Sequence, residues 1–263
     1  MGPHDRWTAL LDILGRDGRL DVGDAAAELD VSAATIRRDL DHLAGQQLLT
    51  RTRGGAAQAS VAYDLPLRYK SGRNTEQKSR IGAATAALME PGSVVAINGG
   101  TTTSEVARAL VTVPPSAPMD GSSGYVFTVV TNALNIANDL AVRRTIKLVV
   151  TGGVARPSSY ELIGPLAEPG LAKLHLDYAV LGVDGFDLTV GATAHHEGEA
   201  AVNAMMVAQA STVLVVADGS KLGRRSFARI CGVAEVDVLI TDIGADPAQV
   251  AAFTEAGIRV IQA

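Results

Sequence analysis

Four arginines lie close together in the first quarter of the chain, and they are well suited to bind an anionic partner. They are Arg37, Arg38, Arg51 and Arg53. Only two acidic residues fall within the same interval. Guanidinium groups form paired hydrogen bonds with guanine and clamp backbone phosphates, so a local cluster of them is typical of a surface that reads DNA. Two adjacent arginines alone are more often a solvated helix face, so the interpretation depends on the elements that carry them.

Three short helices are predicted around this cluster, and their spans are 5–16, 22–29 and 33–44. The first follows from apolar residues that recur at helical spacing between Trp7 and Leu14. Asp21 and Ser32 stand immediately before the other two helices, where their side-chain oxygens can accept hydrogen bonds from free backbone N–H groups. Two helices joined by so short a turn are typical of a helix-turn-helix unit.

The third helix is expected to present Arg38 to solvent. Apolar residues at the i, i+4, i+7 spacing of a buried stripe begin at Ile36 and end at Leu43. Arg38 then falls outside the stripe, on a face that can enter the major groove of DNA. Residues 48–53 are followed by two glycines and predict a small β-ribbon, which carries the other two arginines.

Beyond residue 72, apolar runs alternate with helical patterns, which predicts an α/β domain with a mostly parallel sheet. The runs are 94–97, 126–130, 146–150, 178–181, 213–217 and 238–240. In parallel sheets, ligands bind beyond the carboxyl ends of the strands, so polar and glycine residues near those ends are candidates for an effector site. The candidates are Asn98, Gly99, Gly100, Thr101, Thr102, Thr103, Asn132, Gly153, Asp184, Glu199 and Lys221.

Residues 98–103 suit a phosphate group, because they lead from a predicted strand into a predicted helix. Free backbone N–H groups and the helix dipole favour an anion there, and threonine hydroxyls add donors. Lys221 would place a positive charge beside the phosphate, while Asn132, Asp184 and Glu199 would bind sugar hydroxyls. Glycine and threonine after a strand often only form turns, but five such loops in register favour a ligand site. Neither glycine-rich nucleotide-binding pattern is present, so a dinucleotide or nucleoside triphosphate is not indicated.

The sequence resembles the DeoR family of bacterial repressors through residues 31–40, VSAATIRRDL, and residues 48–56, LLTRTRGGA. The likeness continues along nearly the whole chain, through Glu76, Lys78, Gly100-Thr101-Thr102, Thr131-Asn132, Gly152-Gly153, Glu199-Ala200 and Ser220-Lys221. Asn98 is a departure, because the family commonly has an acidic residue at this position.

The resemblance implies a winged helix-turn-helix and a larger Rossmann-like sensor domain that is similar in fold to ribose-5-phosphate isomerase. Residues 57–72 show no sustained period and are interpreted as a linker. The DNA-binding domain then spans 1–56, and the sugar-phosphate effector-binding domain spans 73–263. The resemblance also implies that four residues of the third helix and its cap lie at or near the duplex: Ser32, Thr35, Arg37 and Arg38.

Two other functions remain open on the sequence alone. Asp184, Asp187, Glu199 and Lys221 are acid–base groups that a sugar-phosphate isomerase with a DNA-binding appendage would use. The larger domain could instead be only an oligomerisation scaffold, in which case no phosphorylated sugar would change its melting temperature. The exposed arginines of the third helix favour regulation over catalysis, because they serve no purpose in an isomerase.

Composition and spacing argue against several other classes of protein. A net charge of −5 over 263 residues opposes indiscriminate binding to polyanions. The single cysteine excludes an internal disulfide and favours a cytoplasmic location, and no apolar run approaches the roughly 18 residues of a membrane span. His195 and His196 lack the His-x-x-x-His spacing of a helical metal site, so we expect no metal and no other cofactor.

The expected partners are therefore double-stranded operator DNA and a phosphorylated sugar. Operators commonly contain two symmetric half-sites, which predicts a homodimer or homotetramer. A ligand that prefers one of two conformations shifts the balance between them, so the effector is expected to control affinity for the operator.

Overall fold

The computed structural model of the chain describes residues 1–46, 48–57, 66–70, 74–114 and 124–263. The chain divides into two compact units, Met1–Arg73 and Asn74–Ala263. Most of the predicted linker at 57–72 lies outside the described residues. Within the described segments, no helix has both the length and the apolar character needed to cross a membrane.

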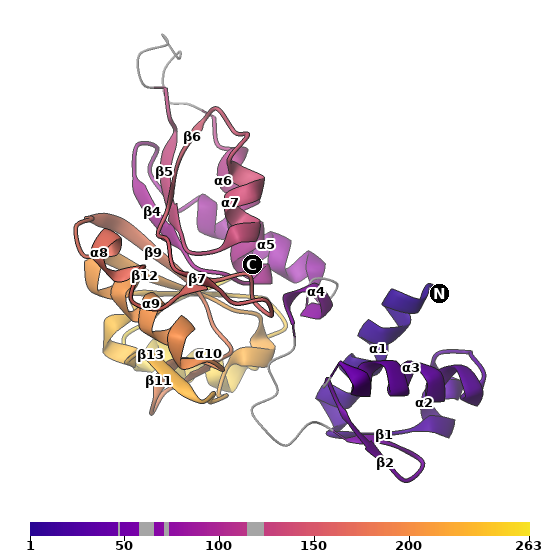
Figure 1. The fold of residues 1–263 in the computed structure, drawn as a ribbon. Helices are drawn as coiled ribbons and strands as arrows, with labels where there is room; N and C mark the ends of the chain where they lie inside the picture. The colour runs from indigo at the N-terminus through magenta and orange to yellow at the C-terminus, as the bar shows by residue number, and fades with distance from the viewer. Residues whose placement is uncertain (47, 58–65, 71–73, 115–123) are drawn as a thin grey trace. The chain divides into compact units, whose positions relative to one another are not determined.

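The described part of the first unit contains helices and a small antiparallel sheet (Figure 1). The helices are α1 Pro3–Asp17, α2 Val22–Glu28, α3 Ala33–Gly45 and α4 Leu67–Lys70. The strands, in the order β1-β3-β2, are β1 Arg19–Asp21, β3 Gly55–Ala57 and β2 Thr50–Thr52. The winged helix-turn-helix prediction is confirmed. Strand β1 was not predicted, because a segment of only three residues is too short to show a period. Of the predicted ribbon at 48–53, only the segment of β2 is a strand.

Side-chain caps and a small apolar core determine how these helices begin and pack. Asp21 Oδ1 accepts a hydrogen bond from Gly23 N at 2.6 Å, and Ser32 Oγ accepts one from Thr35 N at 3.2 Å. Both caps therefore form where the sequence places them. Tyr69 of α4 joins the core. The fully buried aliphatic side chains of this core are those of Leu10, Leu11, Leu14, Ile36, Leu40 and Leu43.

The second unit is built on a seven-stranded sheet in which the described strand pairs are all parallel (Figure 1). In sheet order the strands are β15 Arg259–Gln262, β14 Val238–Thr241, β12 Ala210–Val216, β9 Leu176–Gly182, β4 Val94–Ile97, β5 Phe127–Thr131 and β6 Ile146–Val150. The predicted parallel sheet is confirmed, and every predicted run overlaps a strand. β15 is absent from the prediction because this edge strand contains only two consecutive apolar residues, Val260 and Ile261.

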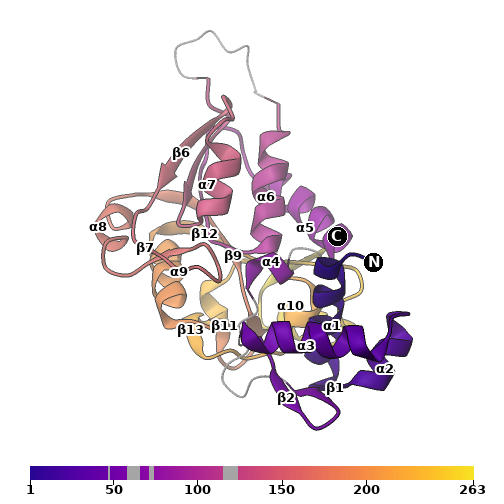
Figure 2. The ribbon, with the colours of Figure 1, turned by 45° about the vertical axis from the view of Figure 1, so that its right-hand side comes forward.

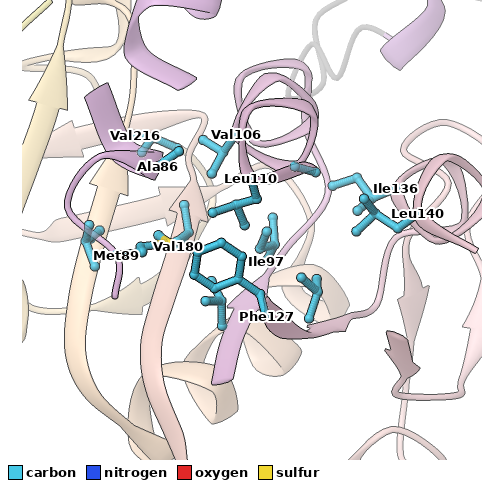
Figure 3. Close-up of a cluster of buried hydrophobic side chains, with 14 of the residues drawn as sticks. Ala86, Met89, Ile97, Val106, Leu110, Phe127, Ile136, Leu140, Val180 and Val216 are labelled. Atoms are coloured by element: carbon cyan, nitrogen blue, oxygen red, sulfur yellow. The ribbon is translucent and has the colours of Figure 1, made fainter. Parts of the chain in front are cut away.

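Helices cover both faces of the sheet (Figure 2). One face packs against α5 Thr75–Ala86, α6 Thr101–Val111 and α7 Leu134–Leu140, and the other against α8 Glu168–Leu171, α9 Glu197–Gln209 and α10 Pro247–Glu255. Val95 and Ile97 of β4 contribute to the first core, whereas Ala96 between them contributes to the second. Figure 3 shows Phe127 and Ile97 packed beside Leu110 of α6. With both faces covered, the loops at the strand ends remain as places for a ligand.

Shorter elements extend the second unit beyond this sheet. A hairpin pairs β7 Val154–Ala155 with β8 Leu162–Ile163. A separate antiparallel sheet contains β10 Gly185–Asp187, β11 Gly191–Ala194 and β13 Ala228–Cys231. Two 3-10 turns, η1 Gly219–Lys221 and η2 Val233–Glu235, complete the described elements. The hairpin bears on the site because β8 packs against α9 and Glu161, just before β8, bridges to Ala133 after β5.

Candidate nucleic-acid interface and effector site

In the first unit, α3 presents two arginines to solvent. Ile36 and Leu40 are fully buried, while Arg37 and Arg38 are exposed, so the predicted outward direction of Arg38 is confirmed. Neither arginine forms an ion pair with another side chain in the described part of the chain. Their guanidinium groups are therefore available to phosphates or base edges.

The start of α3 carries two hydroxyl groups next to free backbone N–H groups. Ser32 Oγ and Thr35 Oγ1 are 2.9 Å apart, and Ser32 is exposed while Thr35 is half-buried. A helix N-terminus with hydroxyl donors is well suited to a phosphate of the DNA backbone. The structure thus brings the predicted contact residues of this helix together at one end.

The acidic residue beside the two arginines is neutralised inside the unit. Asp39 is 6% exposed, forms a salt bridge with Arg6 of α1, and accepts a hydrogen bond from Trp7 Nε1 at 2.8 Å. A further contact joins Arg6 Nη2 to Asp39 Oδ1 at 3.1 Å, and the hydrogen bonding to Asp39 raises the pKa of Arg6. Asp39 therefore fixes α3 against α1. Sequence reasoning missed this role because the partners lie 33 and 32 positions away.

The two arginines of the wing have different surroundings. Arg51 Nε donates to Asp41 Oδ1 of α3 at 2.8 Å, and its Nη1 donates to the Gly55 carbonyl. Arg53 is exposed and precedes Gly54, whose φ of 92° lets the chain reverse between β2 and β3. No ion pair of Arg53 is found among the described residues. The structure thus ties Arg51 to the helix and leaves Arg53 exposed on the wing.

In the second unit, neighbouring strands bring most of the predicted effector residues to one edge of the sheet. The strand order there is β12-β9-β4-β5-β6, and the carboxyl ends of parallel strands share an edge. Residues 98–103 follow β4, Asn132 follows β5, Asp184 follows β9 and Lys221 follows β12, while Gly153 comes after β6. Adjacent strands are about 4.8 Å apart, so β4 and β12 are separated by roughly 10 Å.

The turn after β4 is only partly exposed. Asn98 is 1% exposed, and its amide both accepts a hydrogen bond from Gly182 N at 2.8 Å and donates one to Gly182 O at 2.9 Å. This amide holds the ends of β4 and β9 together. An ionised carboxylate could accept the hydrogen bond from Gly182 N but could not donate one to Gly182 O. Gly100 and Thr101 are partly exposed at the N-terminus of α6, whereas the two threonines that follow are buried. An anion would therefore meet Gly100 and Thr101.

A carboxylate that sequence reasoning missed covers Gly99. Glu161 is 4% exposed, and its Oε2 accepts a hydrogen bond from Asn132 Nδ2 at 2.9 Å. A Cβ on residue 99 would lie 2.4 Å from Glu161 Cγ and 2.5 Å from its Oε1, so the close approach requires glycine. Asn132 is 0% exposed, and its Oδ1 has no hydrogen-bond partner among the described residues. No sequence signal identifies Glu161, because it follows no apolar run.

Two further predicted residues organise the β7–β8 hairpin. Glu199 of α9 forms a salt bridge with Arg156 at 2.9 Å, with only 7% and 18% of the two side chains exposed. Arg156 is a basic residue that sequence reasoning missed. Gly153 has a φ of 126°, and a Cβ there would lie 2.9 Å from the Ile163 carbonyl oxygen. Glu199 and Gly153 thus hold the hairpin in place beside the strand ends.

Asp184 and the two histidines meet near the start of α9. Asp184 Oδ2 accepts a hydrogen bond from His195 N at 3.0 Å, and its Oδ1 is 3.8 Å from His195 Nε2. His196 Nδ1 accepts a hydrogen bond from Gly198 N at 3.0 Å and caps α9. Throughout the described segments, no group of three His, Cys, Asp or Glu side chains has the geometry of a metal site. His196 thus has a structural role as a helix cap, and the backbone of His195 is fixed by Asp184.

Lys221 lies in a short loop that two aspartates hold. It is half-buried at the end of η1. Asp218 Oδ1 accepts a hydrogen bond from Ser220 N at 3.1 Å, and Asp242 Oδ2 accepts one from Gly219 N at 2.6 Å. These bonds fix the backbone beside Lys221 after the end of β12. The ammonium group of Lys221 can bind an anion from this position.

Family comparisons match both units. Residues 6–61 match the DeoR-like helix-turn-helix domain, and residues 73–243 match the DeoR C terminal sensor domain. The chain is 33% identical to a putative aga operon transcriptional repressor of Escherichia coli O157:H7, over 99% of this chain and 94% of that protein. It is 34% identical to the HTH-type transcriptional repressor GlcR of Bacillus subtilis, over 92% and 89% of the two chains. A glycerol-3-phosphate regulon repressor of Escherichia coli K12 is 29% identical over 92% of both.

Solved structures that align with this chain include a regulator and an enzyme. The full-length sorbitol operon regulator SorC of Klebsiella pneumoniae aligns with a TM-score of 0.42 and 15% identity, over 96% of this chain and 99% of that one. A ribose 5-phosphate isomerase of Methanocaldococcus jannaschii aligns with a TM-score of 0.39 and 17% identity, over 56% and 54%.

Proposed function

The chain belongs to the DeoR family of DNA-binding transcriptional regulators, and we propose that it represses an operon of sugar metabolism under the control of a phosphorylated sugar. Family matches cover both units. The cited relatives are repressors, and this chain aligns with most of the length of each. The isomerase alternative is therefore not supported. The observation that carries the proposal is the exposed arginine pair of α3 in a chain whose second unit matches a sensor domain.

We assign DNA recognition to the exposed face of α3 and to the wing. Arg37 and Arg38 would reach base edges or phosphates in the major groove, with Ser32 and Thr35 at the backbone. Arg53 would add a backbone contact from the wing. Arg51 would act through its bond to Asp41, which holds the wing against α3. Because operators commonly have two symmetric half-sites, we expect a homodimer or homotetramer.

We assign effector binding to the edge formed by the ends of β4, β5, β9 and β12. The phosphate would bind at Gly100 and Thr101, where the α6 dipole favours an anion, with Lys221 as the positive charge. Asn132 and Asp184 would bind sugar hydroxyls. The remaining candidates would support this site without contacting the ligand: Asn98, Gly99, Thr102, Thr103, Gly153 and Glu199.

Control of DNA binding follows from a difference in effector affinity between two conformations. If the sugar phosphate binds more tightly to a conformation that does not match the operator, it lowers the affinity for DNA by at most the ratio of its affinities for the two conformations. The coupling free energy in such systems is commonly about 1–3 kcal/mol, which corresponds to a 5- to 150-fold change in affinity.

Fluorescence anisotropy on the DNA upstream of the protein's own gene tests this function. The full-length protein should bind in a salt-dependent manner, and at least one phosphorylated sugar should change its affinity. Arg38→Ala should weaken binding and reduce the salt slope by about one if it removes one phosphate contact. Arg16→Ala is the matched control, because its side chain is 63% exposed on α1. Unaltered binding by the Arg38 variant, or no response to any sugar phosphate, would contradict the corresponding half of the proposal.

A further inference from the structure

Glu161 is a buried carboxylate at the ligand-binding edge of the sheet. We propose that Glu161, together with Asn132, recognises hydroxyl groups of the effector and so selects polyhydroxylated phosphates over simple anions. This assignment rests on the proposed effector site. It adds a specificity-determining residue that neither the strand pattern nor the DeoR-like motifs recognised in the sequence include.

The position of Glu161 places its carboxylate between two strand ends. Ala133, just after β5, forms an isolated antiparallel bridge with Glu161, and Leu162 N donates to Asn132 O at 2.6 Å. The side chain then reaches over Gly99, at the end of β4. Because β4 and β5 are neighbours in the sheet, the carboxylate lies where ligands of parallel α/β sheets bind.

The absence of a side chain at Gly99 makes this approach possible. A Cβ at this position would be within 2.4–2.7 Å of three Glu161 side-chain atoms, far inside van der Waals contact. Gly99 has no positive φ that would demand glycine for backbone reasons. The clearance for the carboxylate therefore accounts for glycine at this position.

Asn132 supplies an independent indication of a ligand. Its Nδ2 donates to Glu161 Oε2 at 2.9 Å and to Leu162 O at 3.3 Å, so both amide hydrogens are used and the amide orientation is fixed. That Oδ1 is buried and has no partner among the described residues. A buried acceptor without a donor is costly, so the arrangement calls for an incoming hydrogen-bond donor.

The chemistry of these acceptors distinguishes between the two ends of a sugar phosphate. A hydroxyl group can donate to the Glu161 carboxylate or to Asn132 Oδ1, whereas an ionised phosphate offers only acceptors and cannot donate to either. The phosphate is therefore directed away from Gly99, toward Thr101 and the Lys221 loop. The strands β4 and β12 are roughly 10 Å apart. The hydroxyl end of one sugar phosphate can therefore contact Glu161 and Asn132 while its phosphate lies toward Thr101 and the Lys221 loop.

Calorimetric titration of the full-length protein tests the assignment. The probes are glycerol 3-phosphate, ribose 5-phosphate, glucose 6-phosphate and fructose 6-phosphate, with inorganic phosphate as the probe without carbon-bound hydroxyls. Glu161→Gln keeps an oxygen for Asn132 Nδ2 but removes the charge. We expect it to weaken the tightest sugar phosphate by about 10- to 100-fold, since hydrogen bonds to charged groups are the strong ones. Affinity for inorganic phosphate should stay the same or rise.

Two controls separate recognition from a structural role. Glu197→Gln removes a carboxylate that is 71% exposed on α9 and should leave every affinity unchanged. Glu161→Asp keeps the charge but withdraws it by one methylene, and it should also weaken the sugar phosphate. Both Glu161 variants should retain the wild-type operator affinity without effector, which a merely misfolded domain would not explain.

The outcomes distinguish this assignment from the function on which it rests. If wild-type protein binds none of the four hydroxylated phosphates more tightly than inorganic phosphate, the proposed effector class fails and the assignment of Glu161 fails with it. If a sugar phosphate binds the wild type and both Glu161 variants equally, the assignment alone is overturned. An equal loss of affinity for sugar phosphate and inorganic phosphate also overturns it, because hydroxyl recognition would not weaken binding of the bare anion.

Discussion

Replacing Asp39 with alanine tests whether a buried ion pair holds the recognition helix in place. The side chains of Arg6 and Asp39 are only 12% and 7% exposed, and Asp39 also accepts the Trp7 indole hydrogen bond. Removal of one partner from a buried pair costs about 3–5 kcal/mol, because the other charge stays behind without compensation. Arg6 retains some exposure, so we expect the lower end, about 3 kcal/mol.

This loss would be a large part of the stability of so small a unit. For domains of about 60–100 residues, 1 kcal/mol lowers the melting temperature by roughly 4–8 °C, so the expected decrease is roughly 12–24 °C. Trp7 is the single tryptophan of the chain, and its fluorescence therefore reports the unfolding of the first unit separately from the second. Thermal unfolding followed by tryptophan emission is the measurement.

Two further variants make the Asp39 result interpretable. Asp41→Ala removes the exposed partner of Arg51, whose pair should contribute under about 1 kcal/mol because Asp41 is 67% exposed. A double replacement, Arg6→Met with Asp39→Leu, should recover much of the stability, since apolar residues of similar volume often substitute for a buried pair. If Asp39→Ala melts within about 3 °C of the wild type, or no lower than Asp41→Ala, the argument from buried charge is wrong.

Three other predictions follow from the contacts described above. Arg53→Ala should reduce the salt slope of operator binding by about one without lowering the melting temperature, whereas Arg51→Ala should also destabilise the wing; equal effects would contradict the distinction. Gly99→Ala should displace the Glu161 side chain and weaken sugar-phosphate binding while operator affinity without effector is retained; unchanged titrations would refute the steric argument. Burial raises the pKa of the Cys231 thiol to about 11, so the folded protein at pH 8 should resist iodoacetamide until it is unfolded, and fast alkylation of native protein would disprove this.

Local patterns account for the parts of the fold that the sequence predicted well. The run at Val94–Ile97, the cap at Ser32 and the buried stripe that begins at Ile36 each involve residues within a few positions of one another. Periodicity and capping are local effects, so they can be read without knowledge of the remaining chain. Strands such as β1 and β15 were not predicted, because three or four residues at the edge of a sheet contain too few apolar positions to show a period.

The roles of individual side chains depend on partners far away in the chain. Asn98 was predicted to bind the effector, but its amide pairs with a glycine 84 positions later. Glu199 was predicted to bind hydroxyls, and it pairs with an arginine 43 positions earlier. Arg51 was grouped with the other arginines, yet it braces the wing against α3. Most of the predicted effector residues share an edge of the sheet, but their individual roles in binding stay predictions.

The amino-acid sequence by itself determined the family, the two kinds of unit and the outward direction of Arg38, because these depend on motifs and on spacing within single elements. Only the tertiary structure decided that Asp39 is neutralised by α1 and that Glu161 covers Gly99. Both contacts join residues more than 30 positions apart in sequence, and a buried charge finds its partner through packing rather than through any local pattern. A carboxylate such as Glu161 therefore acquires its place in the site only when the chain has folded.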